Sequence, residues 1–221
     1  MEYLTHELIS AGRTEELAEF ICKDKSAWQD GKKTAGSQAA KVKNNFQLDR
    51  DSKTSKEASS QVISKIVEDQ LLKSFCLPRK IHGVMFSRSG EGQGYGHHVD
   101  NAYMSSGRSD LSFTLFLSPP NQYKGGELCI QTIQDSQEFK LPAGHIVIYP
   151  STSLHSVNKV DKGERLVCVG WIESYVSSNE DRNILFGLDA GAKGLMSNYG
   201  HSPQLDLVFQ AYNNLLRRLG D

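Results

Sequence analysis

The residues best suited to chemistry in this chain are His98, Asp100 and His155. Two imidazoles and one carboxylate form the ligand set that holds non-haem Fe(II) on one face of the ion and leaves the opposite positions open. Alternate residues of a strand point to the same face, so His98 and Asp100 can reach one ion together, and His155 can complete the triangle from a later strand. A structural zinc site would normally use four protein ligands. The pattern therefore predicts an open metal site.

A cation follows these three residues. Arg165 begins an otherwise apolar strand and shares a face with Val169 and Trp171. A buried charge without a partner is strongly unfavourable, and a guanidinium matches a carboxylate with two parallel hydrogen bonds. We therefore expect Arg165 to bind the carboxylate of an anionic co-substrate. The alternative is a structural salt bridge to Asp161 or Glu164 in the preceding turn.

Other polar residues border this predicted site. His97 is adjacent to His98 and would point to the opposite face of a regular strand, so we expect it at the pocket rim or in solvent. In the loop that follows, Tyr103, Met104 and Arg108 are candidate substrate contacts. The remaining histidines have no partner at ligand spacing and are predicted to be surface or core residues: His6, His82, His145 and His201.

These side chains need a β scaffold to hold them. Between residues 79 and 173 the sequence consists of short strands separated by turn residues, and 110–118 alternates strictly between two faces. Closely spaced short strands favour a sandwich or barrel over βαβ units. Helical patterns flank the β region at 13–23, 59–75, 203–219 and, over a shorter stretch, near 180–188, where a glycine-rich passage follows.

The predicted fold class is therefore mainly β with flanking helices (α+β), with a double-stranded β-helix, or jelly roll, as the core. We divide the chain into three regions. Residues 1–78 would be an N-terminal region of helices and edge strands packed on the core. Residues 79–174 would be the core itself, and residues 175–221 a C-terminal helical extension.

Composition excludes several classes of protein. The chain has 221 residues, 38% hydrophobic and 23% charged, with a net charge of -1. This charge provides no basic field for nucleic acid, and no apolar run is long enough to span a membrane. The first residues lack the pattern of a secretory signal. The four cysteines are widely spaced in apolar contexts and are expected to be buried, reduced thiols, which favours a cytoplasmic location.

Several stretches resemble the bacterial PKHD-type hydroxylases, which are Fe(II)- and 2-oxoglutarate-dependent dioxygenases similar to prolyl 4-hydroxylases. The resemblance covers nearly the whole chain, including the helical tail. It is most specific in Tyr-Gly-His-His-Val-Asp-Asn-Ala, which begins at Tyr95, and in Leu-Pro-Ala-Gly-His-Ile-Val-Ile-Tyr-Pro-Ser-Thr-Ser-Leu-His, which ends at His155. The N-terminal stretches Trp28–Gly36 and Val42–Asn45 resemble the same family.

The resemblance implies an activity and roles for individual residues. His98, Asp100 and His155 match the iron ligands of the family, and Arg165 matches its anchor for 2-oxoglutarate. The implied reaction uses O2 to hydroxylate a C–H bond of a peptidyl or amino-acid side chain, and it releases succinate and CO2. Ascorbate is the implied reductant, and a homo-oligomer is compatible with the pattern. The chain has Ser89 where the family usually has an aromatic residue, so Tyr95 takes part of that role.

Two other functions stay open from the residues alone. A cupin-like hydrolase or isomerase would hold zinc or nickel at the triad and would not need Arg165. A degenerate barrel would act as a non-catalytic binding module, although loss of function should leave gaps at the triad positions. Metal content and 2-oxoglutarate binding by the purified protein discriminate among the three.

Overall fold

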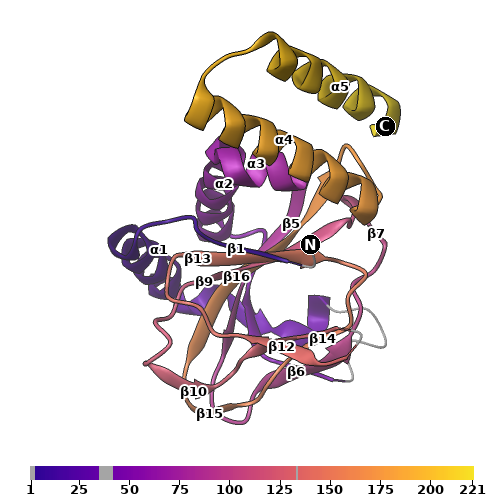
Figure 1. Ribbon diagram of the computed structural model, residues 1–221. Coiled ribbons are helices and arrows are strands. Elements are labelled where there is room, and N and C mark those ends of the chain that lie inside the picture. Colours follow the sequence, from indigo (N-terminus) through magenta and orange to yellow (C-terminus); the bar gives the residue numbers. More distant parts are fainter. Residues whose placement is uncertain (1–2, 35–41, 133) are drawn as a thin grey trace.

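A computed structural model describes residues 3–34, 42–132 and 134–221 (Figure 1). The end of the Trp28–Gly36 stretch that resembles the family, residues 35–36, lies outside the described residues. In the rest of the chain the strands pair antiparallel in two larger sheets and two short pairs, and helices flank them. The prediction of a β region with helices before and after it is confirmed.

The larger sheet contains seven strands. In spatial order they are β1 (Leu4–Glu7), β13 (His145–Pro150), β9 (Leu111–Phe116), β16 (Arg165–Ser174), β5 (Pro78–Ser89), β4 (Phe46–Leu48) and β2 (Trp28–Asp30). The second sheet has five strands, in the order β12 (Ser136–Phe139), β11 (Leu128–Gln131), β14 (His155–Val157), β6 (Gly94–His98) and β3 (Lys43–Asn44). The short pairs are β10 (Tyr123–Gly125) with β15 (Val160–Gly163), and β7 (Tyr103–Met104) with β8 (Gly107–Arg108).

The alternation in β9 explains how the sheets and helices pack. Leu111, Phe113 and Leu115 belong to a core shared with the N-terminal helices. Phe116, on the other face of the strand, belongs to a second core that includes Ile130 of the smaller sheet. Successive side chains of a strand point to opposite faces, so one strand contributes to both cores. The larger sheet is thus covered by helices on one face and by the smaller sheet on the other (Figure 1).

The N-terminal helices are α1 (Ala11–Lys23), α2 (Lys53–Glu68) and α3 (Gln70–Cys76), with single 3-10 turns at Lys25–Ala27 and Gly31–Thr34. The prediction of one helix over 59–75 is wrong, because the chain leaves the helical conformation at Asp69. The Asp69 side chain accepts a hydrogen bond from the Leu72 backbone N–H at 2.8 Å and so caps a new helix.

The C-terminal helices are α4 (Asn179–Tyr199) and α5 (Pro203–Leu219), which form a hairpin above the sheets in Figure 1. The expected 203–219 helix is confirmed. The expected short segment near 180–188 is wrong, because α4 continues through Gly187, Gly191 and Gly194. A side chain at any of these glycines would meet no atom within 4 Å, so they lie on an open face of the helix. Packing of α4 on α3 and α5 offsets their low helix propensity.

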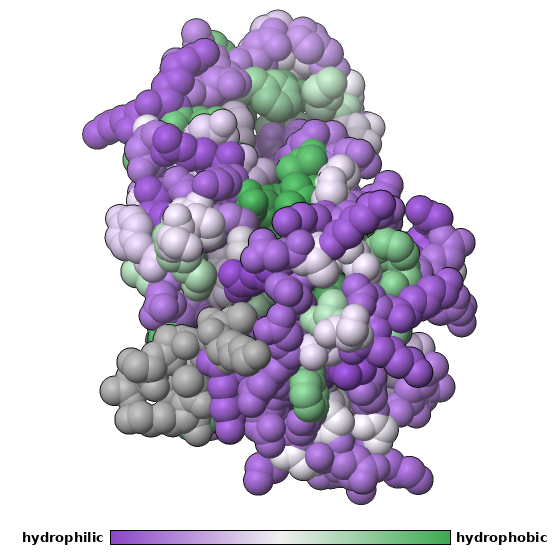
Figure 2. All heavy atoms as spheres, turned by 180° about the vertical axis from the view of Figure 1, so that it is seen from behind, coloured by the Kyte–Doolittle hydropathy of each residue, from purple (hydrophilic) through white to green (hydrophobic). Residues whose placement is uncertain are grey.

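The face of the molecule opposite to that of Figure 1 is mostly hydrophilic (Figure 2). Hydrophobic atoms on this face gather mainly in the upper half, toward the helical hairpin. No described helix is long and apolar enough to cross a membrane. All four cysteines are free. Cys76, Cys129 and Cys168 are buried as expected, whereas Cys22 is only partly buried.

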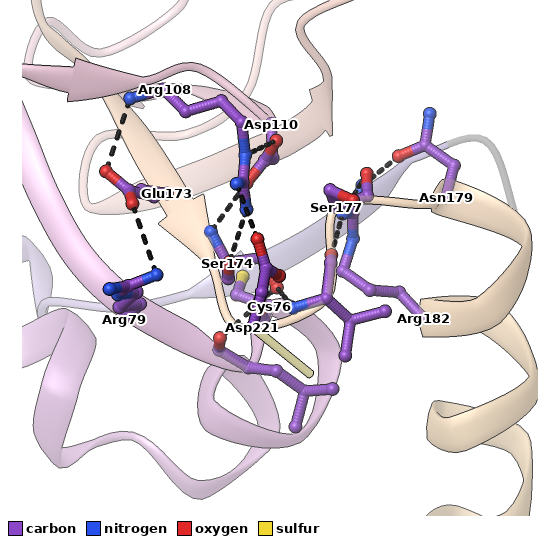
Figure 3. Close-up of polar contacts among 12 residues, drawn as sticks. Cys76, Arg79, Arg108, Asp110, Glu173, Ser174, Ser177, Asn179, Arg182 and Asp221 are labelled. Carbon is purple, nitrogen blue, oxygen red and sulfur yellow. Dashed lines mark hydrogen bonds and ion pairs between the residues drawn. The ribbon is translucent and has the colours of Figure 1, made fainter. Parts of the chain in front are cut away.

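A polar cluster ties the end of the chain to the sheets (Figure 3). We call it the Arg108 cluster, and its members are Arg108, Asp110, Glu173, Ser174 and Asp221. The Arg108 guanidinium donates to both carboxylate oxygens of Asp110, to Asp221 and to the Ser174 carbonyl, at 2.8 to 3.1 Å. The Arg108 backbone N–H donates to Glu173 at 3.2 Å, and the Ser174 N–H donates to Asp110 at 2.8 Å. The sequence indicates Arg108 as a candidate substrate contact, but its guanidinium donors are used within this cluster.

Candidate metal centre

His98, Asp100 and His155 lie at one point between the two sheets. One ligand atom from each side chain lies within 4.8 Å of those of the other two. The cause is strand pairing, because β14 and β6 run antiparallel with His155 directly opposite His98. Asp100 follows the end of β6, and its Oδ2 lies 3.9 Å from the Nε2 of His155. The arrangement brings together the three residues that the sequence singled out.

Hydrogen bonds orient both imidazoles. The Nδ1 of His98 lies 2.8 Å from the Gly96 carbonyl oxygen, and the Nδ1 of His155 lies 3.0 Å from the Ser153 carbonyl oxygen. Because a carbonyl can only accept, each Nδ1 carries the proton and each Nε2 keeps its lone pair for a metal. Burial and the neighbouring His155 lower the pKa of His98 to about 4, which keeps this imidazole neutral at physiological pH. Metal binding needs the neutral form.

The carboxylate of Asp100 is also held in place. The Ser112 hydroxyl donates to its Oδ2 at 2.6 Å, and Ser112 in turn lies 2.7 Å from the Ser151 hydroxyl. One carboxylate oxygen is thereby fixed by a neutral donor, and the charge remains available to a cation. The sequence pattern gives no sign of Ser112 and Ser151, because their contact depends on the pairing of β9 with β13.

Tyr95 extends the site away from the metal ligands. Its ring stacks on the His98 imidazole with centroids 3.6 Å apart. An irregularity in the register between β14 and β6 brings these two side chains together although they are three residues apart. His97 is exposed and lines the same cavity at its rim, as expected. The other four histidines lie outside the cavity lining.

A cavity of about 900 Å³ opens beside the triad and reaches Arg165. It is lined by strands of both sheets and by the β7–β8 hairpin, from which Tyr103 and Met104 contribute. Its size is that of a small-molecule binding site. Asp100 is the only carboxylate among the described residues that line it.

Arg165 lies at the inner end of this cavity with unused donors. The residue is 3% exposed, and its Nε and Nη2 atoms have no hydrogen-bond partner in the described part of the chain. Burial lowers the pKa of the guanidinium, and nearby Tyr123 opposes this effect. Neither Asp161 nor Glu164 pairs with Arg165, so the alternative of a structural salt bridge is wrong. Unpaired guanidinium donors beside a cavity fit the carboxylate of a ligand.

Ser89, the departure from the family pattern, lies close to this guanidinium. It is 3% exposed and pairs directly with Arg165 across β5 and β16. The small Ser89 side chain therefore leaves space beside the guanidinium where an aromatic residue would stand. Tyr149, another ring near Arg165, is buried, and burial raises the pKa of its hydroxyl well above the ordinary value.

Comparison with known proteins identifies the family. A family model described as "2OG-Fe(II) oxygenase superfamily" matches residues 84–173. The PKHD-type hydroxylase of Prochlorococcus marinus strain MIT 9313 is 68% identical over 220 residues, which cover 100% of both chains. The PKHD-type hydroxylase P9211_12561 of strain MIT 9211 is 65% identical over 221 residues, again with 100% coverage of both.

Solved structures share the fold at low sequence identity. A Pseudomonas putida prolyl-4-hydroxylase has a TM-score of 0.56 and 17% identity, over 78% of this chain and 92% of that one. A Trichoplax adhaerens prolyl hydroxylase, solved with a hypoxia inducible factor peptide fragment, has a TM-score of 0.57 and 12% identity, over 83% and 86% of the two chains. The chain is therefore an enzyme of the 2OG-Fe(II) oxygenase superfamily and belongs to the PKHD-type hydroxylases.

Proposed function

We propose that His98, Asp100 and His155 hold Fe(II), and that Arg165 binds the distal carboxylate of 2-oxoglutarate. The enzyme would then hydroxylate a C–H bond of a peptidyl or amino-acid side chain and release succinate and CO2. The observation that carries this proposal is one cavity lined by a three-ligand cluster and by a buried guanidinium with unpaired donors.

Each side chain has a distinct task in this proposal. When bound, Fe(II) would activate O2, and the electrons that reduce O2 would come from 2-oxoglutarate and from the C–H bond that is oxidised. The two imidazoles contribute neutral donors, whereas Asp100 offsets part of the metal charge. Arg165 orients the co-substrate through its planar donors. The apolar cavity wall near Val167 and Val169 excludes water from this part of the site.

We further propose finer features of the enzyme. The strands that residues 79–174 contribute to the two facing sheets would form the double-stranded β-helix core, with 1–78 and 175–221 as flanking regions that add edge strands and helices. Ascorbate would keep the iron reduced. A cytoplasmic location agrees with four free cysteines, since reducing compartments preserve thiols. The family identity does not favour a cupin-like hydrolase or a non-catalytic barrel.

Succinate release tests the iron assignment. Anaerobically iron-loaded protein, given 2-oxoglutarate and then O2, should release succinate above the rate without protein. Asp100→Ala should bind metal at least about 100-fold more weakly. Loss of a residue that only hydrogen-bonds to a metal ligand lowers metal affinity by about 10- to 100-fold, and loss of a ligand itself should cost at least as much. Exposed Asp161→Ala is the matched control. If Asp100→Ala contains as much metal as the unchanged protein, the assignment is refuted.

A further inference from the structure

A buried tyrosine near Arg165 has no part in the proposed function. Tyr123 begins β10, which pairs with β15, and the residue is 5% exposed. Its hydroxyl oxygen is buried and has no hydrogen-bond partner among the described residues. A buried hydroxyl without a partner is unfavourable, and a phenylalanine would fill the same space without this cost. The stability of the fold therefore does not explain the hydroxyl group of Tyr123.

The side chains of Tyr123 and Arg165 lie side by side against Gly126. A Cβ atom at Gly126 would be 3.2 Å from Cε2 of Tyr123 and 3.1 Å from Cδ of Arg165. The φ of Gly126 is 71°, in the left-handed region, so another residue would be strained there as well as crowded. The glycine thus lets the aromatic ring and the arginine pack closely together.

The two side chains also interact electrostatically. Burial raises the pKa of the Tyr123 hydroxyl, and the charge of Arg165 opposes this effect. Burial lowers the pKa of Arg165, and Tyr123 is the strongest of the neighbouring groups that raise it. The phenol is neutral at physiological pH, because its pKa lies above the ordinary value. A neutral oxygen can accept a hydrogen bond from the guanidinium without cancelling its charge.

Other contacts fix the ring of Tyr123 and leave its hydroxyl unused. The Nζ of Lys140 lies 4.3 Å from the ring centroid and donates to the Tyr123 carbonyl at 2.8 Å. The carboxylate of Glu127 is nearby, but one of its oxygens lies 3.7 Å from the Lys140 Nζ and the other accepts from Asn158 at 3.3 Å. The ring is therefore held in place beside Arg165, and the hydroxyl is available to it.

The unused groups of the two residues are complementary. Arg165 has donors without partners at Nε and Nη2, and the phenol oxygen of Tyr123 is an acceptor without one. Arg165 lines the cavity, whereas Tyr123 does not. The phenol therefore approaches the guanidinium from within the protein, and a ligand approaches it from the cavity.

We propose that Tyr123 is a positioning residue for the co-substrate: when 2-oxoglutarate binds, the phenol oxygen accepts one N–H of Arg165 and directs the remaining donors at the distal carboxylate. This role rests on the proposed function, which assigns Arg165 to that carboxylate. A guanidinium held in one orientation has less freedom to lose on binding, so the ligand binds more tightly. The unfavourable unpaired hydroxyl of the ligand-free protein then finds its partner only in the complex.

Tyr123→Phe tests this role, because it removes the oxygen and keeps the ring. We would load the full chain with Mn(II), which takes the place of Fe(II) without turnover, and titrate it with 2-oxoglutarate by calorimetry. Binding should be about fivefold weaker, the usual effect of one hydrogen bond. In urea denaturation the ligand-free variant should be as stable as the unchanged protein or more stable. Lower stability with normal affinity is the result of a merely structural tyrosine and would overturn the proposal.

Tyr175→Phe is the matched control. It removes a hydroxyl from a residue that is 49% exposed and that follows the end of β16 opposite to Arg165. Neither the affinity for 2-oxoglutarate nor the stability should change. If Tyr175→Phe weakens binding as much as Tyr123→Phe does, the effect is not specific to Tyr123 and the proposal is wrong.

A shorter keto acid and a double variant show whether Tyr123 acts through Arg165. 2-Oxobutyrate has the keto acid end of 2-oxoglutarate and no distal carboxylate, so Tyr123→Phe should leave its binding unchanged. Tyr123→Phe added to Arg165→Met should weaken 2-oxoglutarate binding no further, because no guanidinium is left to position. An equal loss of affinity for both keto acids, or fully additive losses in the double variant, would contradict a role through Arg165.

Arg165→Met alone separates this proposal from the proposed function. If Arg165→Met binds 2-oxoglutarate normally, the assignment of Arg165 fails, and the role of Tyr123 fails with it. If Arg165→Met binds weakly and Tyr123→Phe binds normally, the proposed function stands and only the role of Tyr123 is wrong.

Discussion

Arg108 is partly buried and Arg165 is fully buried, and the two side chains have different surroundings. The guanidinium of Arg108 donates to Asp110, Asp221 and the Ser174 carbonyl, and these bonds raise its pKa. Arg165 is more deeply buried and leaves Nε and Nη2 without partners, and burial lowers its pKa. A fold does not bury unpaired guanidinium donors for stability. The first arginine therefore supports the structure, and the second is available to a ligand.

One strand connects these two regions. Arg165 is the first residue of β16, and Ser174, a member of the Arg108 cluster, is the last. The satisfied cluster fixes one end of the strand against the chain terminus and the β7–β8 hairpin (Figure 3). The opposite end of β16, which carries Arg165, is held by the pairing of β16 with β5 and β9. This pairing keeps the guanidinium of Arg165 in position although two of its donors lack partners among the described residues. Rigid support of this kind is what a binding site requires.

Removing Arg108 should give the largest effect on stability. Arg108→Met would leave Asp110, whose side chain is 6% exposed, without its ion-pair partner. We expect a loss of about 3 kcal/mol in the free energy of unfolding, measured by urea denaturation. Asp221→Asn should cost less than about 1 kcal/mol, since the Asp221 side chain is 54% exposed. Equal stability of Arg108→Met and the unchanged protein would remove the contrast between the two arginines.

Removing Arg165 should affect ligand binding and leave the fold intact. Arg165→Met eliminates a buried charge that has no protein partner, so the ligand-free protein should unfold at the same or a higher denaturant concentration. Binding of 2-oxoglutarate should weaken by about 10- to 100-fold, as expected for lost charge-assisted hydrogen bonds. Calorimetry on protein loaded with Mn(II), which replaces Fe(II) without turnover, measures this affinity. A variant that is destabilised and still binds 2-oxoglutarate normally would show that Arg165 is structural.

The sequence identified the parts of the site that depend on short spacing and strand pattern. These signals predicted the metal ligands His98 and Asp100 and the start of a strand at Arg165. They also predicted the alternation within β9. Ser112 could not, because its contact with Asp100 arises only when strands distant in sequence pair. Lys43, a buried residue that lines the cavity, was missed for a similar reason: its polar surroundings have no periodicity, and β3 acquires its position from pairing with β6.

The helix boundaries failed for a different reason. Local signals compete there with packing that the sequence pattern does not show. Asp69 caps a new helix inside a continuous apolar pattern, and so divides one predicted helix into two. In α4 the opposite happens, since Gly191 and its neighbouring glycines would weaken an isolated helix, whereas contacts with α3 and α5 maintain it.

Lys43 is a third buried cation and offers the finest test of the contrast. Burial and the charge of Arg50 lower its pKa to about 8. The folded protein therefore disfavours the charged ammonium, whose pKa in an unfolded chain is about 10.4. The free energy of unfolding should rise between these two pH values, because Lys43 loses its proton at lower pH in the folded protein than in the unfolded chain.

Urea denaturation at a series of pH values measures this dependence. Lys43→Gln should show a smaller rise, because the residue that titrates is gone. Exposed Lys159→Gln should keep the full rise. A rise of the same size in Lys43→Gln would assign the titrating group to another residue, and Lys43 would then resemble Arg108, whose pKa is raised in the fold, more than Arg165, whose pKa is lowered by burial.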